Sequence, residues 1–153
     1  MRIQTKIFGE VEIDDEKIIR FENGIIGFPE LTEFVLMHDS EKPDGGVVRW
    51  LQSLQEPAFA MPVMDPLLVA PDYNPQVEDE LLKPVGTLDP DQLLVLVTLT
   101  VPSDIQQMSV NLRAPIVIQT QSRKACQIIV DNDSYPVKYQ IYELLQRAKK
   151  AGE

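Results

Sequence analysis

The chain has 153 residues, 44% of them hydrophobic, which suffices for the core of one domain spanning residues 1–153, and its single cysteine excludes an internal disulfide. Acidic residues outnumber basic ones by 24 to 14, and the resulting net charge of −10 repels phosphate backbones, so we expect no direct binding to nucleic acid. No signal-like apolar core opens the chain, and its longest nearly apolar run, residues 93–101, is too short to cross a bilayer; we therefore expect a cytoplasmic protein without membrane contact.

The first third of the chain alternates polar and apolar residues, which is typical of strands with one buried face. Five extended segments are predicted there, at residues 3–8, 11–13, 17–21, 34–37 and 47–54. Asn23 and Gly24 both tolerate a positive φ angle and so predict a turn. The polar, glycine-containing residues 40–46 predict a loop between the last two of these strands.

Proline dominates the middle of the chain, where six of the twelve prolines lie between Pro57 and Pro84. Each proline lacks a backbone donor and disfavours helical geometry in the residue before it, so no long helix is expected here. Residues 58–63 and 67–70 are predicted to be short extended pieces. Asn74, a capping residue followed by proline, predicts one short helix that runs through Leu82.

The last third combines strands with a helix. Residues 93–101 are too apolar for a half-exposed strand and predict a central one, and residues 109–112, 115–120 and 124–130 are expected to complete a meander. One helical face is shared by Val137, Ile141, Leu144, Leu145 and Ala148, which predicts a C-terminal helix. The predicted fold class is mostly β: a single-domain antiparallel β-barrel or closed sandwich of short strands with a C-terminal helix.

Few residues in this sequence are suited to catalysis. His38 is the only histidine and is expected to be a surface or hydrogen-bonded residue rather than a base. Cys126 lies among apolar residues and is expected to be a small buried side chain with a raised pKa. Pro136 and Tyr142 stand where a calcium-binding loop starting at residue 131 would need glycine and glutamate. We therefore predict a binding protein with no catalytic residues, no metal and no cofactor.

Two segments are candidates for binding a partner. In the first, residues 72–91, six acids and one lysine are mixed with apolar residues, as in an interface of a few apolar anchors inside a charged rim. The residues predicted to bind there are Asp72, Tyr73, Glu78, Asp79 and Glu80. The second candidate segment is a turn between glycines, and the residues predicted to bind a partner there are Asn23, Ile25 and Ile26. The alternatives are a solvated loop whose leucines face the core and, for the turn, an apolar plug of the barrel end.

Three parts of the chain carry a family resemblance. The first part is IRFENGIIGFPEL at residues 19–31. The second begins with WLQSL at residues 50–54 and continues with PAFA at 57–60, DP at 65–66 and PDY at 71–73. The third is MSVNLRAPIVI at residues 108–118, followed by KACQIIV at 124–130. In these letters and in their order the chain resembles the bacterial flagellar assembly factor FliW family. The resemblance spans nearly the whole chain and implies the same β-barrel architecture that the strand spacing predicts.

The resemblance also implies a function. FliW-like proteins are cytoplasmic, non-enzymatic regulators with two alternative partners: flagellin before its export, and CsrA, a small RNA-binding regulator that represses flagellin translation. Free protein would antagonise CsrA, and accumulated flagellin would capture the protein and restore repression. We expect it to be a monomer when free, and to dock beside the RNA site of CsrA rather than within it. The alternatives are a general flagellin export chaperone without a translational role and, from another class, a carboxylate-based enzyme, which a deep pocket of convergent acids would reveal.

Overall fold

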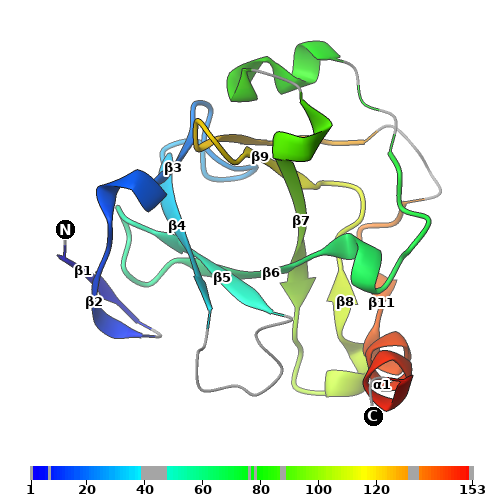
Figure 1. Cartoon of the computed structure of the whole chain (residues 1–153). Coiled ribbons are helices and arrows are strands. Elements are labelled where there is room, and N and C mark those ends of the chain that lie inside the picture. The colour runs from blue at the N-terminus through cyan, green and yellow to red at the C-terminus, as the bar shows by residue number, and fades with distance from the viewer. Residues whose placement is uncertain are drawn as a thin grey trace.

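The computed structural model describes residues 2–6, 8–38, 48–75, 77, 79–86, 89–130 and 135–151. Seven strands within this part of the chain close a β-barrel, which confirms the predicted fold class (Figure 1). Around the ring the strands are β3 (Ile19–Phe21), β4 (Glu33–His38), β5 (Arg49–Ser53), β6 (Ala60–Met64), β7 (Leu93–Thr100), β9 (Ile116–Gln119) and β10 (Lys124–Gln127). Neighbours are antiparallel except β10 and β3, whose parallel pairing closes the ring.

The barrel interior is filled by the inward-facing apolar residues of these strands. Phe21 and Phe34 are fully buried and meet edge to face with their ring centroids 5.2 Å apart. β9 is buried on both faces: Ile116 and Ile118 belong to the interior cluster, whereas Val117 packs in a separate cluster on the outside. The outer face of this part of the barrel is therefore covered by other elements.

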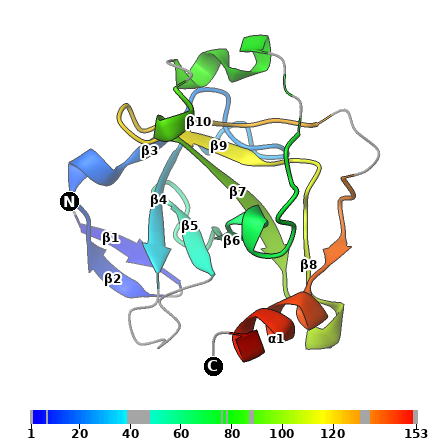
Figure 2. The ribbon, with the colours of Figure 1, turned by 45° about the vertical axis from the view of Figure 1, so that its right-hand side comes forward.

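A hairpin covers one outer side of the barrel. β1 (Arg2–Thr5) pairs with β2 (Gly9–Glu12), and the short 3-10 helix η1 (Asp15–Lys17) leads from the hairpin to β3. Ile3 and Ile13 pack against Val35 of β4. Figure 2 shows this hairpin lying outside the ring.

A second extension lies at the opposite end of the chain. β8 (Ser109–Val110) pairs with the end of β7 and with β11 (Tyr139–Gln140), next to the 3-10 helix η5 (Ile105–Gln107). The C-terminal helix α1 (Tyr142–Ala151) follows directly, and its Leu144 and Leu145 pack on a cluster that contains the fully buried Ile141. No helix in the described ranges has the length and apolar character needed to span a membrane.

The connection between β6 and β7 contains the 3-10 helices η2 (Pro66–Leu68), η3 (Asp79–Val85) and η4 (Pro90–Gln92). η3 lies above the barrel in Figures 1 and 2 and covers the outer side of β9 and β10. Its Val85 is fully buried with Val117 and Cys126. The proline-rich segment thus serves as a cover for one barrel face.

Two predictions for this connection are wrong. Residues 67–70 are not extended, because the Asp65 carboxylate accepts a hydrogen bond from the Leu67 amide at 2.9 Å and starts η2 with proline at its first position. The helix expected to begin after Asn74 and to run through Leu82 begins at Asp79 and continues to Val85 as a 3-10 helix that includes a proline.

The C-terminal third also differs from expectation. The three short strands do not form a simple meander, since β8 pairs with β7 and β11 rather than with β9. The strand β11 was not predicted, and Val137 lies before it with 52% of its surface exposed, so this residue is not part of the helix face. The helix itself is confirmed from Tyr142 onward. The loop predicted at residues 40–46 lies outside the described residues.

Candidate functional site

An apolar groove of about 520 Å³ lies on the outer surface of the barrel, between η2 and η3. Its floor is formed by side chains of β7 and β9 and by the residue that follows β10. We name it the β7–β9 groove, and its lining residues are Asp65, Pro66, Leu67, Tyr73, Asn74, Pro75, Val77, Leu82, Leu93, Leu94, Val95, Pro115, Val117 and Ile128.

The groove exists because the cover over the barrel is incomplete. Val95 and Val117 face outward from strands whose alternate residues, Leu96 and Ile116, fill the barrel interior. Leu82 from η3 packs against part of this outer surface. Leu67 of η2 stands on the opposite side, and 52% of its surface remains exposed. An apolar surface is therefore left accessible between two covering elements.

A pair of tyrosines holds the wall of the groove. The Tyr73 hydroxyl donates to the carbonyl oxygen of Leu112 at 2.7 Å, and its ring meets that of Tyr135 edge to face at 4.7 Å. The Tyr135 hydroxyl accepts a hydrogen bond from the Asn74 amide at 3.1 Å. Burial, and secondarily Tyr135, raise the pKa of Tyr73 to about 12. Tyr73 therefore stays neutral and fixes the loop that carries Asp72 and Asn74.

The surroundings of the β7–β9 groove are acidic. Residues 65–92 contain seven acids and one base, Lys83. Asp65 lines the groove, and Asp72, Asp79 and Glu80 are exposed in the loop and the helix beside it. Within the described residues, none of these four carboxylates takes part in an ion pair. The groove combines an apolar floor with carboxylates that have no bound counter-charge.

The residues predicted for the first candidate segment fall into two groups. Asp72, Asp79 and Glu80 are exposed, as a charged rim requires, but Tyr73 is 93% buried and supports the wall instead of projecting toward a partner. Glu78 lies outside the described residues. Leu82 packs against a buried cluster, as expected for a helix whose leucines face the core, while Leu81 is half exposed, and the binding role of the segment stays a prediction.

The second candidate segment is divided by burial. Ile25 is buried in the barrel core cluster and acts as the plug, whereas Ile26 and Asn23 are exposed. The Ile26 amide donates to Gln127 Oε1 at 2.9 Å, and the Phe28 ring packs against Phe59. The turn therefore presents Ile26 and Phe28 at the surface on a fixed backbone.

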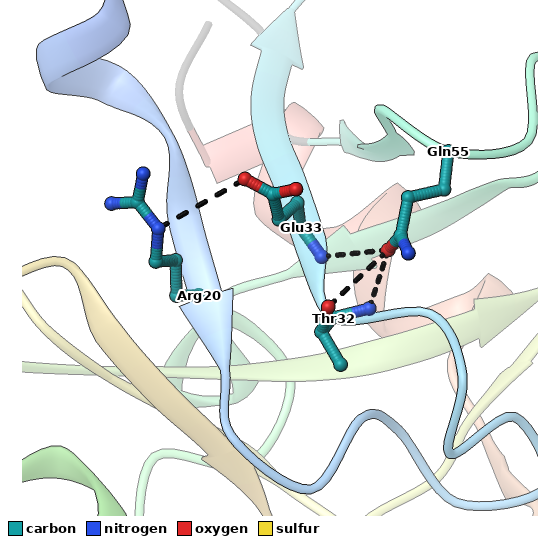
Figure 3. A network of polar contacts seen from close by, with 4 residues as sticks. All are labelled: Arg20, Thr32, Glu33 and Gln55. Atoms are coloured by element: carbon teal, nitrogen blue, oxygen red, sulfur yellow. Dashed lines mark hydrogen bonds and ion pairs between the residues drawn. The ribbon is translucent and has the colours of Figure 1, made fainter.

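A polar network fixes the other end of this segment (Figure 3). Gln55 Oε1 accepts hydrogen bonds from the Thr32 amide at 2.7 Å and the Glu33 amide at 3.1 Å, while Gln55 Nε2 donates to the Glu30 carbonyl oxygen at 3.0 Å. Arg20 Nε lies 3.9 Å from the Glu33 carboxylate, across β3 and β4. These contacts join backbone groups of successive loops, and we assign them a structural role.

In the part of the chain that the structure describes, the side chains suited to catalysis do not lie together. Cys126 is buried beneath η3 with its Sγ 3.9 Å from the Leu81 carbonyl oxygen, and burial raises the pKa of its thiol to about 11. His38 ends β4, and its side chain lies outside the described part. Among the described residues, no three His, Cys, Asp or Glu side chains are grouped as a metal site would need.

Sequence reasoning missed the groove floor. The sequence places Leu93, Val95, Val117 and Ile128 in strands but does not show that Leu93 and Val95 stay partly exposed on the outer face, whereas Val117 and Ile128 are buried. One signal was present: residues 93–101 are apolar at both alternating sets of positions, so a strand there needs cover on both sides. The identity of the cover depends on contacts between residues far apart in the chain.

Comparison with known proteins places this chain in a family. The model of the FliW protein family matches residues 2–141. A flagellar assembly factor FliW of Lachnoclostridium phytofermentans is 44% identical over 151 residues, covering 98% of this chain and 97% of that protein. One of Lachnospira eligens is 45% identical over 148 residues, covering 96% and 98%.

A solved structure agrees with these relatives. The crystal structure of the flagellar assembly factor FliW superposes with a TM-score of 0.84 at 32% identity, covering 93% of this chain and 97% of that one. The sequence match and the fold match thus extend over the same barrel. The chain belongs to the FliW family of flagellar assembly factors.

Proposed function

We propose that this protein is a non-enzymatic, cytoplasmic regulator of flagellar assembly that binds two partners alternately, a CsrA-type translational regulator and flagellin. Free protein binds the regulator and antagonises its repression of flagellin mRNA. Accumulated flagellin captures the protein and restores repression, because each partner lowers the pool available to the other. The observation that carries the proposal is the acid-rimmed β7–β9 groove in a chain of this family, which suits a protein ligand better than a small substrate.

The experiment is a competition between purified partners from the bacterium that encodes this chain. We expect the protein to bind the CsrA-type regulator and flagellin separately, and flagellin to displace the regulator completely. Size-exclusion chromatography with light scattering reports each complex and the state of the free protein, for which we expect a monomer. A stable complex of all three proteins, or no binding to either partner, contradicts the proposal.

The antagonism is proposed to act from beside the RNA site. An acidic surface docked there lowers RNA affinity by charge repulsion, which is a coupling between two sites and not a competition for one. Inhibition is therefore expected to persist when a flagellin leader RNA is raised to large excess. If excess RNA fully displaces this protein from the regulator, the acidic surface occupies the RNA site itself.

The acidic segment is proposed to steer association with a basic partner. Asp79→Asn with Glu80→Gln should lower the association rate severalfold and flatten its salt dependence, because complementary charge acts mainly on the association rate. Asp15→Asn with Glu16→Gln, exposed acids of η1, is the control with the same change in net charge. Stopped-flow mixing at several ionic strengths measures both. Equal rates for the two double variants would remove η3 from the interface.

A general export chaperone without a translational role is the second candidate. It shares flagellin binding but requires no contact with the CsrA-type regulator. The exposed apolar residues Ile26 and Phe28 are compatible with shielding a hydrophobic substrate. A flagellin-leader reporter distinguishes the two functions: addition of this protein should raise translation only in the presence of the regulator.

A further inference from the structure

We infer that the β7–β9 groove is a docking site for a partner segment that places an apolar side chain next to a lysine or arginine. The inference rests on the proposed function and assigns its chemistry: the apolar side chain enters the groove, and the cation meets the carboxylates beside it. The ligand is thus a basic, apolar peptide segment of another protein.

The groove lining selects the apolar part of this segment. The partly exposed Val95, Leu93 and Leu82 line the groove, the buried Val117 and Ile128 lie beneath them, and the half-exposed Leu67 stands at its side. Tyr73 contributes its ring, but its hydroxyl is already bonded to the Leu112 carbonyl oxygen and is not free for a ligand. An inserted side chain therefore meets mainly carbon, and its burial removes apolar surface of both partners from water.

The negative charge near the groove favours a lysine or arginine beside the apolar side chain that enters it. Among the described residues that line the groove, the charged one is Asp65; Asp72 is exposed in the adjoining loop, and Asp79 and Glu80 are exposed on η3, where they border a neighbouring pocket together with Lys83. In the described part of the chain these carboxylates lack ion-pair partners, so a cation brought next to the groove gains attraction without having to displace a local one. An acidic segment of equal hydrophobicity is repelled.

The polar rim supplies a means of orientation. Asn74 lies at the groove with its backbone amide bonded to Tyr135, and its side chain is exposed. A side-chain amide both donates and accepts, so it can pair with the backbone of a docked segment. The other grooves suit this ligand less: one is bordered by Asp79, Glu80 and Lys83, and another by the mixed charges of η1 and the turn after β9.

The first test uses the purified full chain with flagellin and the CsrA-type regulator as probes. Leu67→Glu places a charge over the floor and should weaken binding of at least one partner roughly tenfold or more. Ile105→Glu is the matched control, because Ile105 is also 52% exposed but lies in η5, and it should change binding less than about twofold. If the wild type binds and both variants bind equally well, the inference is wrong while the proposed function stands.

The second test does not depend on either partner. Three synthetic peptides of equal length serve as probes, one of leucine and lysine, one of leucine and glutamate, and one of serine and lysine. Only the first should shift the NMR signals of Val95, Val117 and Ile128, and Asp79→Lys with Glu80→Lys should abolish the shifts. The inference is overturned if the glutamate peptide binds as well, if the lysine peptide shifts other surfaces only, or if the free protein self-associates through this groove.

Discussion

Gly24 occupies a backbone position that other residues tolerate poorly. Its φ angle is +68°, and an added Cβ atom would lie 2.5 Å from the Pro29 carbonyl oxygen. Gly9 has nearly the same φ angle, +69°, but open space around it. We expect Gly24→Ala to lower the free energy of unfolding by about 2–4 kcal/mol and Gly9→Ala by only about 1–2 kcal/mol. Urea denaturation measures both, and equal losses would show that the contact with Pro29 relaxes without cost.

Cys126 provides a prediction about pH. Its thiol has a pKa of about 11 in the folded chain against 9.0 without the fold, because burial disfavours the thiolate. Between these two pKa values the folded state keeps the thiol proton while the unfolded state releases it. The contribution of Cys126 to the free energy of unfolding is therefore complete below pH 9 and is lost as the pH rises toward 11. The urea midpoint should fall between pH 8 and pH 10, and it should fall less in Cys126→Ala. If the urea midpoints of the wild type and Cys126→Ala changed equally with pH, the thiol of Cys126 would have an ordinary pKa in the folded chain.

Among the secondary-structure elements, η2 affects both the stability of the fold and the charge of the β7–β9 groove. Asp65 caps η2 through the Leu67 amide and also contributes one of the rim charges. Asparagine caps as well as aspartate, so Asp65→Asn should preserve stability and remove only the charge, whereas Asp65→Ala should cost about 1 kcal/mol. Thermal unfolding distinguishes the two. Partner affinity should fall in both variants, and an effect confined to Asp65→Ala would mean that the cap matters and the charge does not.

The strands were predictable where local pattern decides them. β7 follows from its apolar run, and β9 and β10 follow from two shorter, largely apolar runs separated by a polar connection. η2 was missed although Asp65 followed by proline is a helix start, because Pro66 was treated only as a breaker while the same pattern was used at Asn74. The burial of Tyr73 could not be predicted, since the carbonyl that its hydroxyl binds belongs to Leu112, 39 residues away.

The candidate site was predictable in composition but not in shape. The acidic character of residues 72–91 is a property of the sequence, and Asp72, Asp79 and Glu80 are indeed exposed. The groove arises only when η2 and η3 lie on either side of the same barrel face, which is a long-range arrangement. Ile25 and Ile26 illustrate the same limit, because adjacent identical residues in a turn differ in burial through tertiary contacts alone.

At the scale of the whole molecule, the C-terminal helix lies outside the ring of barrel strands and shares one hydrophobic cluster with it. The ring of strands ends with β10, and the family match ends at residue 141, one residue before α1 begins. In Figures 1 and 2, α1 lies at the end of the barrel away from η3. The helix packs through Leu144 and Leu145 on the cluster around Ile141, so its main contribution is cover for that cluster.

Removing residues 142–153 should therefore leave a folded barrel that is less stable. The loss of two half-buried leucines is expected to lower the free energy of unfolding by about 2–4 kcal/mol. The full-length double variant Leu144→Ala with Leu145→Ala is the control, and it should lose a similar amount because the packing, not the chain length, is responsible. Both variants should retain partner affinity, since no described residue of α1 lines the β7–β9 groove. If affinity falls while circular dichroism shows an intact barrel, α1 itself contributes to docking, and the groove alone does not account for binding.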